Sequence, residues 1–108
     1  MDDYQVELTT GAELDPKTLF LRTAERQGEA EARALLDSLE HAVASLANSP
    51  LRRALPTQLQ SLGISEFRHM LVKPYRVLSR VQDQRVIVFL IAHEKRDFRS
   101  LLEKRLLR

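Results

Sequence analysis

The fold of this chain is decided by the stretch Glu66-Phe-Arg-His-Met-Leu-Val-Lys-Pro-Tyr-Arg-Val-Leu-Ser-Arg-Val81 and by Val86-Ile-Val-Phe-Leu-Ile-Ala-His93, which follows it. Reversals at Lys73-Pro74 and at residues 82–85 divide the segment into three extended runs. The last run is continuously apolar, which is typical of a strand inside a sheet that is covered on both faces. Because short turns join strands in antiparallel order, the sequence predicts a three-stranded meander. Its strands lie near 65–72, 75–81 and 86–93.

The N-terminal part predicts one more strand and a helix. Tyr4–Leu8 alternates apolar and polar residues, as a half-buried strand does. Asp15-Pro16 has the pattern of an N-cap followed by proline at the first helical position. We expect this helix to run through Gln27 and to end at Gly28, where a left-handed conformation costs little.

A second helix is predicted from about Glu29 to Ala47, closed by Asn48-Ser49-Pro50. Because so short a link joins the two helices, they must fold back as an antiparallel hairpin. The apolar residues of the second helix fall within an arc of ~120°, and they are Ala32, Leu35, Leu36, Leu39, Ala42, Val43 and Leu46.

Asp97 is predicted to cap a final short helix, and residues 51–63 form a connector without a clear period. The element order is therefore β-α-α-β-β-β-α, an α+β domain over residues 1–108, with the helical hairpin on one face of a single sheet.

Composition limits the function classes. A chain of 108 residues forms one domain, and without cysteine it has no disulfide, thiolate nucleophile or cysteine zinc site. It has no run of 18 apolar residues, and Met1-Asp2-Asp3 lacks the start of an export signal. We therefore expect a cytoplasmic, bacterial-type protein without a membrane partner, metal, cofactor or small-molecule substrate.

Charge is distributed unevenly along the chain. Residues 1–62 have 6 Lys and Arg against 10 Asp and Glu, whereas residues 63–108 have 11 against 5. The basic C-terminal half suits an acidic protein partner or nucleic acid. A scatter of solvated surface charges explains the same counts equally well.

Arginines occupy the polar positions of the predicted sheet. Strand alternation turns Val77 and Val81 toward the helices and leaves Arg76 and Arg80 on the open face. The planar guanidinium fork binds phosphate or carboxylate through two hydrogen bonds, so a cationic contact surface is expected. Its predicted members are Arg68, Arg76, Arg80, Arg96 and Arg99. Alternatively, each arginine only pairs with a nearby carboxylate: Glu66, Glu94 or Asp97.

The three histidines, His41, His69 and His93, lack the spacing of a metal site. His93 directly precedes the Lys95-Arg96 pair, so it is the candidate acid or base among them. A structural, hydrogen-bonded role for His93 is the simpler alternative.

Leu19, Phe20 and Leu21 are consecutive and spread over ~200° of the first helix. We expect Phe20 on the core side and either Leu19 or Leu21 at the edge. An exposed leucine there is either ordinary surface or the rim of a binding site for a partner helix.

Taken in order, several segments resemble the RelE/ParE superfamily of bacterial toxins. They are Gly28-Glu-Ala-Glu-Ala-Arg33, Glu66-Phe-Arg68, Lys73-Pro-Tyr-Arg-Val77, the strand ending at His93, and Arg96-Asp-Phe-Arg-Ser-Leu-Leu102. The link between the helices and the Pro-Tyr-Arg-Val segment look most like the ParE branch.

The resemblance implies a type II toxin neutralised by a cognate antitoxin. ParE-like members inhibit DNA gyrase, whereas RelE-like members cut messenger RNA on the ribosome. The nuclease pattern places Arg76 and Arg96 at the phosphate and its acid/base near Leu102. Leucine transfers no proton, and residues 97–108 contain neither Tyr nor His, although His93 or a lysine can substitute.

A gyrase inhibitor is therefore the first hypothesis, with the predicted arginines as its target contacts and Leu19 and Leu21 as its antitoxin contacts. A ribosome-dependent endoribonuclease that uses Arg76, Arg96 and His93 is the alternative, and a homologue without toxicity is the third. The first hypothesis assumes outward-facing arginines with no proton-transferring side chain beside them.

Overall fold

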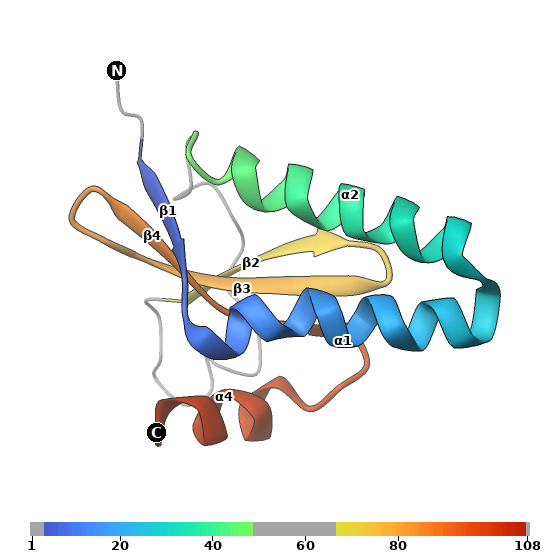
Figure 1. The fold of residues 1–108 in the computed structure, drawn as a ribbon. Coiled ribbons are helices and arrows are strands. Elements are labelled where there is room, and N and C mark those ends of the chain that lie inside the picture. The colour runs from blue at the N-terminus through green and yellow to red at the C-terminus, as the bar shows by residue number, and fades with distance from the viewer. Residues whose placement is uncertain (1–3, 49–66, 108) are drawn as a thin grey trace.

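The computed structural model describes residues 4–48 and 67–107. Its elements follow the predicted order β-α-α-β-β-β-α (Figure 1). They are β1 (Gln5–Leu8), α1 (Thr10–Gln27), α2 (Glu29–Ser45), β2 (Phe67–Val72), β3 (Tyr75–Gln82), β4 (Arg85–His93) and α4 (Phe98–Leu106). The predicted connector at 51–63 lies outside the described residues.

The four strands form one sheet in the order β1-β4-β3-β2. The predicted antiparallel meander of β2, β3 and β4 is confirmed, and β1 joins β4 in parallel, so the sheet is mixed. The β3–β4 register jumps from Leu78↔Leu90 to Ser79↔Val88. Phe89 is thus an extra residue in β4 and forms a β-bulge. Such a bulge locally interrupts the regular pairing of the two strands.

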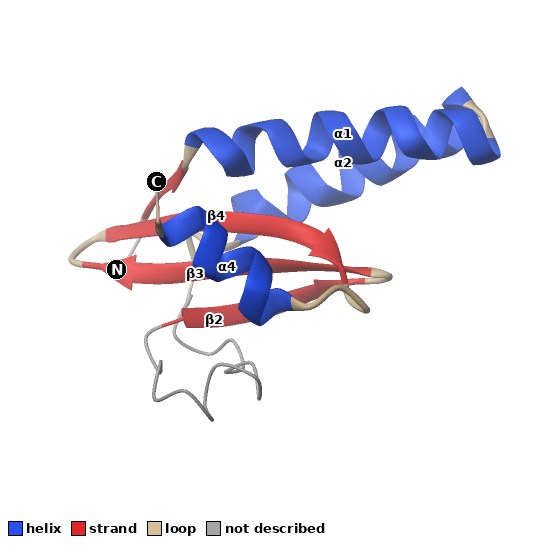
Figure 2. Ribbon diagram, turned by 90° about the horizontal axis from the view of Figure 1, so that it is seen from below, coloured by secondary structure: helices blue, strands red, loops and turns tan. Residues whose placement is uncertain are grey.

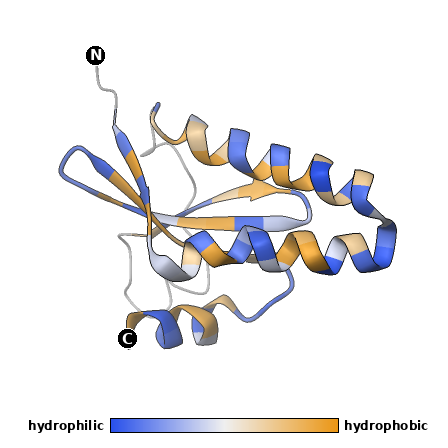
Figure 3. Ribbon diagram, in the orientation of Figure 1, coloured by the Kyte–Doolittle hydropathy of each residue, from blue (hydrophilic) through white to orange (hydrophobic). Residues whose placement is uncertain are grey.

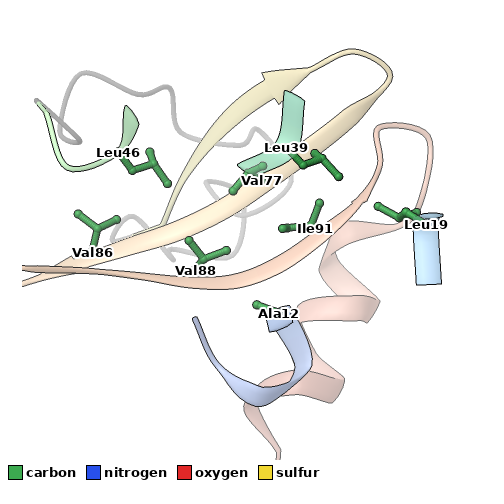
Figure 4. Close-up of a cluster of buried hydrophobic side chains, with 8 residues drawn as sticks. All are labelled: Ala12, Leu19, Leu39, Leu46, Val77, Val86, Val88 and Ile91. Carbon is green, nitrogen blue, oxygen red and sulfur yellow. The ribbon is translucent and has the colours of Figure 1, made fainter. Parts of the chain in front are cut away.

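The helical hairpin of α1 and α2 covers one face of the sheet (Figure 1). Apolar residues recur along both helices and the central strands, as Figure 3 shows in orange. They meet in a buried cluster (Figure 4) that comprises Ala12, Leu19, Leu39, Leu46, Val77, Val86, Val88 and Ile91. Burying such side chains contributes roughly 1.5–3 kcal/mol each for the larger ones, so this interface accounts for much of the fold.

The opposite face of the sheet is covered by α4, which crosses the strands in Figure 2. Here the structure differs from the expected open face. Phe98 and Leu102 of α4 are each 1% exposed. They pack into a second cluster with Phe67, Leu78, Leu90 and Ala92. The reason is the amphipathic pattern of the last helix, whose apolar residues need a partner surface.

The first helix begins earlier than predicted. Thr9 is its N-cap, and the Thr9 hydroxyl accepts a hydrogen bond from Ala12 N–H at 3.2 Å. The predicted cap at Asp15-Pro16 is wrong, because Pro16 lies inside α1 and Asp15 makes tertiary contacts instead. The other end is as predicted: Gly28 has φ 99°, and α2 starts at the next residue.

Candidate functional site

Two of the predicted arginines, Arg76 and Arg80, lie on the face of the sheet that α4 covers. The Arg76 guanidinium carbon is 5.9 Å from the centroid of the Phe98 ring. That of Arg80 lies 5.6 Å from the Phe67 ring and 5.1 Å from the Phe89 ring. Both side chains are half-buried. They therefore lie across aromatic rings as cation–π pairs, each contributing ~0.5–2 kcal/mol, rather than pointing freely outward.

Arg68 does not join them. In β2 its neighbour Met70 packs against the hairpin-side cluster, whereas Phe67 belongs to the cluster under α4. Since side chains alternate along a strand, Arg68 shares the hairpin side with Met70. The structure thus places Arg68 on the opposite face from Arg76 and Arg80.

An imidazole lies beside Arg76, contrary to the expectation that no proton-transferring group would be there. His69 pairs with Leu78 in the β2–β3 ladder and is on the same face as Phe67. Partial burial, together with the charge of Arg76, lowers the pKa of His69 below its ordinary value. Its Nδ1 and the Nε of Arg76 are buried and have no hydrogen-bond partner within the described part of the chain. Sequence reasoning missed His69: strand alternation puts it on the same face as Phe67, but its proximity to Arg76 depends on the β2–β3 register.

His93, the acid/base candidate, is turned the other way. Its ring contacts Tyr75 edge to face at 5.6 Å between centroids, and Tyr75 packs against the hairpin-side cluster. The His93 Nδ1 accepts a hydrogen bond from Lys95 N–H at 3.1 Å. The sheet therefore separates His93 from Arg76, and the expected trio of Arg76, Arg96 and His93 is not brought together.

Arg96 and Arg99 follow β4 and are exposed. Arg99 faces Glu103 at 3.5 Å, one turn further along α4. Asp97 caps α4 as predicted: it accepts hydrogen bonds from the Ser100 N–H and hydroxyl, which lower the pKa of its carboxyl group. Asp97 is thus engaged mainly with Ser100, and the backbone N–H and the charge of Arg99 lower the same pKa to a smaller extent.

The position that the superfamily resemblance assigns to the acid/base is closed. Leu102 is buried between α4 and the sheet and packs with Phe98 and Leu90. Among the described residues, no group of three His, Asp or Glu side chains could hold a metal ion. In the same part of the chain, no helix is long and apolar enough to cross a membrane.

Comparison with known proteins fits this architecture. The family described as the ParE toxin of the type II toxin–antitoxin system, parDE, matches residues 6–98. The chain belongs to this family. The predicted RelE/ParE membership is thereby confirmed.

Two solved structures similar to this ParE-family toxin come from toxin–antitoxin systems. A chain of the chromosomal ParDE system of P. aeruginosa has a TM-score of 0.73 at 14% identity, covering 86% of this chain and 98% of its own. A chain of the RelBE2 toxin–antitoxin complex from Mycobacterium tuberculosis has a TM-score of 0.57 at 25% identity, covering 86% and 93%. No curated protein matches the sequence significantly.

The two leucines expected at the antitoxin contact of this ParE-family toxin differ in exposure. Leu19 is buried against the sheet at 8% exposure, and Leu21 is 62% exposed. One of the pair lies outside, as predicted, but the expected core position of Phe20 is wrong: Leu19 occupies the core and Phe20 is only partly buried. Leu19 belongs to the core and also lines a hollow between α1 and α4, whereas Leu21 is open to solvent.

Proposed function

We propose that this toxin is neutralised by a cognate antitoxin and acts by binding DNA gyrase, without cleaving RNA. Family membership supports the toxin role. The similar ParDE and RelBE2 structures are of toxin–antitoxin systems, which supports an antitoxin partner here.

The premise of outward-facing arginines with no imidazole beside them fails at Arg76, so the gyrase proposal rests instead on the burial of Leu102 under α4. General acid or base catalysis contributes typically 10²–10⁴-fold to a reaction of this kind. An aliphatic side chain at 1% exposure supplies neither the proton nor access for a substrate. A binding protein needs no such group, and an α4 packed on the sheet gives it a rigid surface.

The proposed target surface is the exposed basic segment that leads into α4. Arg96 and Arg99 lie there in solvent, and Phe98, between them in the sequence, contacts the half-buried Arg76. Arginines in such positions pair with acidic side chains and are frequent among the residues that dominate binding energy.

Purified gyrase and relaxed plasmid provide the test. We expect the toxin to inhibit supercoiling and the double variant R96A/R99A to need at least ~5-fold more protein for the same inhibition. The control is Arg33→Ala in α2, since Arg33 is also exposed and also faces a glutamate one turn away (Glu29, 3.7 Å). Undiminished supercoiling with excess toxin would exclude the proposal.

One observation favours a second candidate function, the ribosome-dependent endoribonuclease. His69 lies beside Arg76 on the same face of the sheet, and its lowered pKa favours the neutral imidazole, the form that can accept a proton. Arg76 beside it could stabilise the charge that develops on a phosphate. This pair replaces the combination of Arg76, Arg96 and His93 that the sequence suggested.

Primer extension on a translated message decides between the two functions. If the toxin is a nuclease, new 5′ ends appear and His69→Ala or Arg76→Ala lowers cleavage by ~10²-fold. His41→Ala, an exposed histidine on α2, leaves it unchanged. If the wild-type toxin produces no new ends, the nuclease candidate is ruled out.

A further inference from the structure

A groove between α1 and α4 combines apolar walls with several arginines. It runs along the C-terminal half of β4 and has a volume of about 170 Å³, enough for one large side chain. Its apolar walls are formed by Leu90, Ala92 and Leu101. Arg22 of α1 and Arg96 of the segment between β4 and α4 also line it.

The charge in this groove is not balanced. Arg105 lies in it, but its guanidinium is bound to the Asp15 carboxylate at 2.7 and 3.1 Å. Arg22 and Arg96 have no acidic partner among residues 4–48 and 67–107. Both are exposed and line the same hollow, so an anion placed there gains from two cations at once.

An exposed apolar strip of α1 flanks the groove. Leu14 is 53% exposed and Leu21 is 62% exposed. They are two helical turns apart, with Thr18 of the groove wall between them on the same side of the helix. The apolar strip of α1 therefore adjoins the groove that Arg22 and Arg96 line. An amphipathic segment that has an acidic residue would complement this combined surface.

We propose that this groove binds a carboxylate side chain of the antitoxin, held jointly by Arg22 and Arg96, with an apolar neighbour of that residue on Leu14 and Leu21. The inference rests on the antitoxin pairing proposed above. Beyond that pairing, it specifies that the recognised antitoxin residue is acidic. It also specifies that this residue binds away from Arg76 and Arg80. Because Arg96 is also a proposed target contact, the bound antitoxin would hide it from gyrase.

A double-mutant cycle on the intact toxin–antitoxin complex tests the shared carboxylate. Arg22→Ala and Arg96→Ala should each weaken antitoxin binding by ~10-fold. The double variant should lose less than the product of the two losses, because both guanidinium groups hold the same partner. Arg33→Ala is the matched control and should bind as wild type, and the thermal midpoints of all free toxins should agree.

The outcomes separate the inference from the proposed function. If the wild-type toxin binds its antitoxin and the variants bind equally well, or if their losses multiply fully, the shared carboxylate is refuted and the antitoxin pairing stands. If the wild-type toxin does not bind the antitoxin at all, both the shared carboxylate and the antitoxin pairing are refuted.

Binding of a short fluorescent single-stranded DNA provides the third arm of the experiment. Loss of its binding in the double variant, with antitoxin binding intact, would make the groove a phosphate site and also overturn the inference.

Discussion

At the scale of single residues, Asp15 joins three elements. Its carboxylate accepts two hydrogen bonds from Arg105 of α4 and a third from Ile91 N–H of β4 at 2.8 Å. Arg105 Nη1 also donates to the Phe89 carbonyl at 2.7 Å. Gly11 permits this approach, since a Cβ there would lie 3.0 Å from the guanidinium. The pair is partly buried, at 14% and 23% side-chain exposure for Asp15 and Arg105.

Removing the Asp15 carboxylate should therefore destabilise the whole fold. Asp15→Ala leaves the partly buried Arg105 without its counter-charge and the Ile91 N–H without its acceptor. We expect a loss of about 2–4 kcal/mol in the free energy of unfolding, measured by urea denaturation.

The control for Asp15→Ala is the exposed pair between Glu7 and Arg85, 3.4 Å apart. Glu7→Ala should change the free energy of unfolding by less than ~1 kcal/mol. A loss for Asp15→Ala no larger than that of Glu7→Ala would show that the bidentate contact does not hold α4 to α1.

At the scale of elements, the importance of Asp15 follows from the shortness of β1. The β1–β4 pairing ends at Leu8↔Val88, because Thr9 turns the chain into α1. Beyond it, β4 has no strand neighbour on that side among residues 4–48 and 67–107, and its Phe89 C=O and Ile91 N–H are satisfied by side chains of α4 and α1. Two helices thus complete the edge of the sheet, which protects it from pairing with other chains.

Local periodicity accounts for what the sequence could predict. The order of elements, the antiparallel hairpin and the doubly covered β4 all follow from apolar patterns within single segments. The start of α1 could not be predicted in the same way. An aspartate before a proline has the same sequence pattern whether it caps a helix or forms an ion pair inside one. Thr9, which is the N-cap in the structure, is a second residue of a type that caps helices.

The candidate site was predicted less well because it depends on which elements face each other. Arg76 and Arg80 were placed on the correct strand face, but α4 covers that face. The proximity of His69 to Arg76 required the β2–β3 register, and that of Arg22 to Arg96 required the packing of α1 beside α4. None of these relations is encoded in the spacing of one segment.

At the scale of the whole molecule, the sheet separates two surfaces with different chemistry. The side of α4 holds the arginine–aromatic pairs and His69, and the hairpin side holds the main core. The groove beside Arg22 and Arg96 lies at the border of the two, along the edge of β4. An antitoxin seated there contacts both α1 and α4, so its binding should stabilise the toxin as one unit.

Thermal unfolding can measure how much the bound antitoxin stabilises the toxin, with variants at Leu19 and Leu21 as probes. An antitoxin at 100 times its Kd adds about 2.7 kcal/mol to the stability of the toxin, a rise in midpoint of roughly 10 °C or more for a domain of this size. Leu21→Asp should leave the midpoint of the free toxin unchanged and reduce the rise, because that side chain is exposed and directly precedes Arg22 of the groove. Leu19→Asp should lower the midpoint of the free toxin itself, since it places a charge in the core. An antitoxin-induced rise that is equal in wild type and Leu21→Asp would remove Leu21 from the interface.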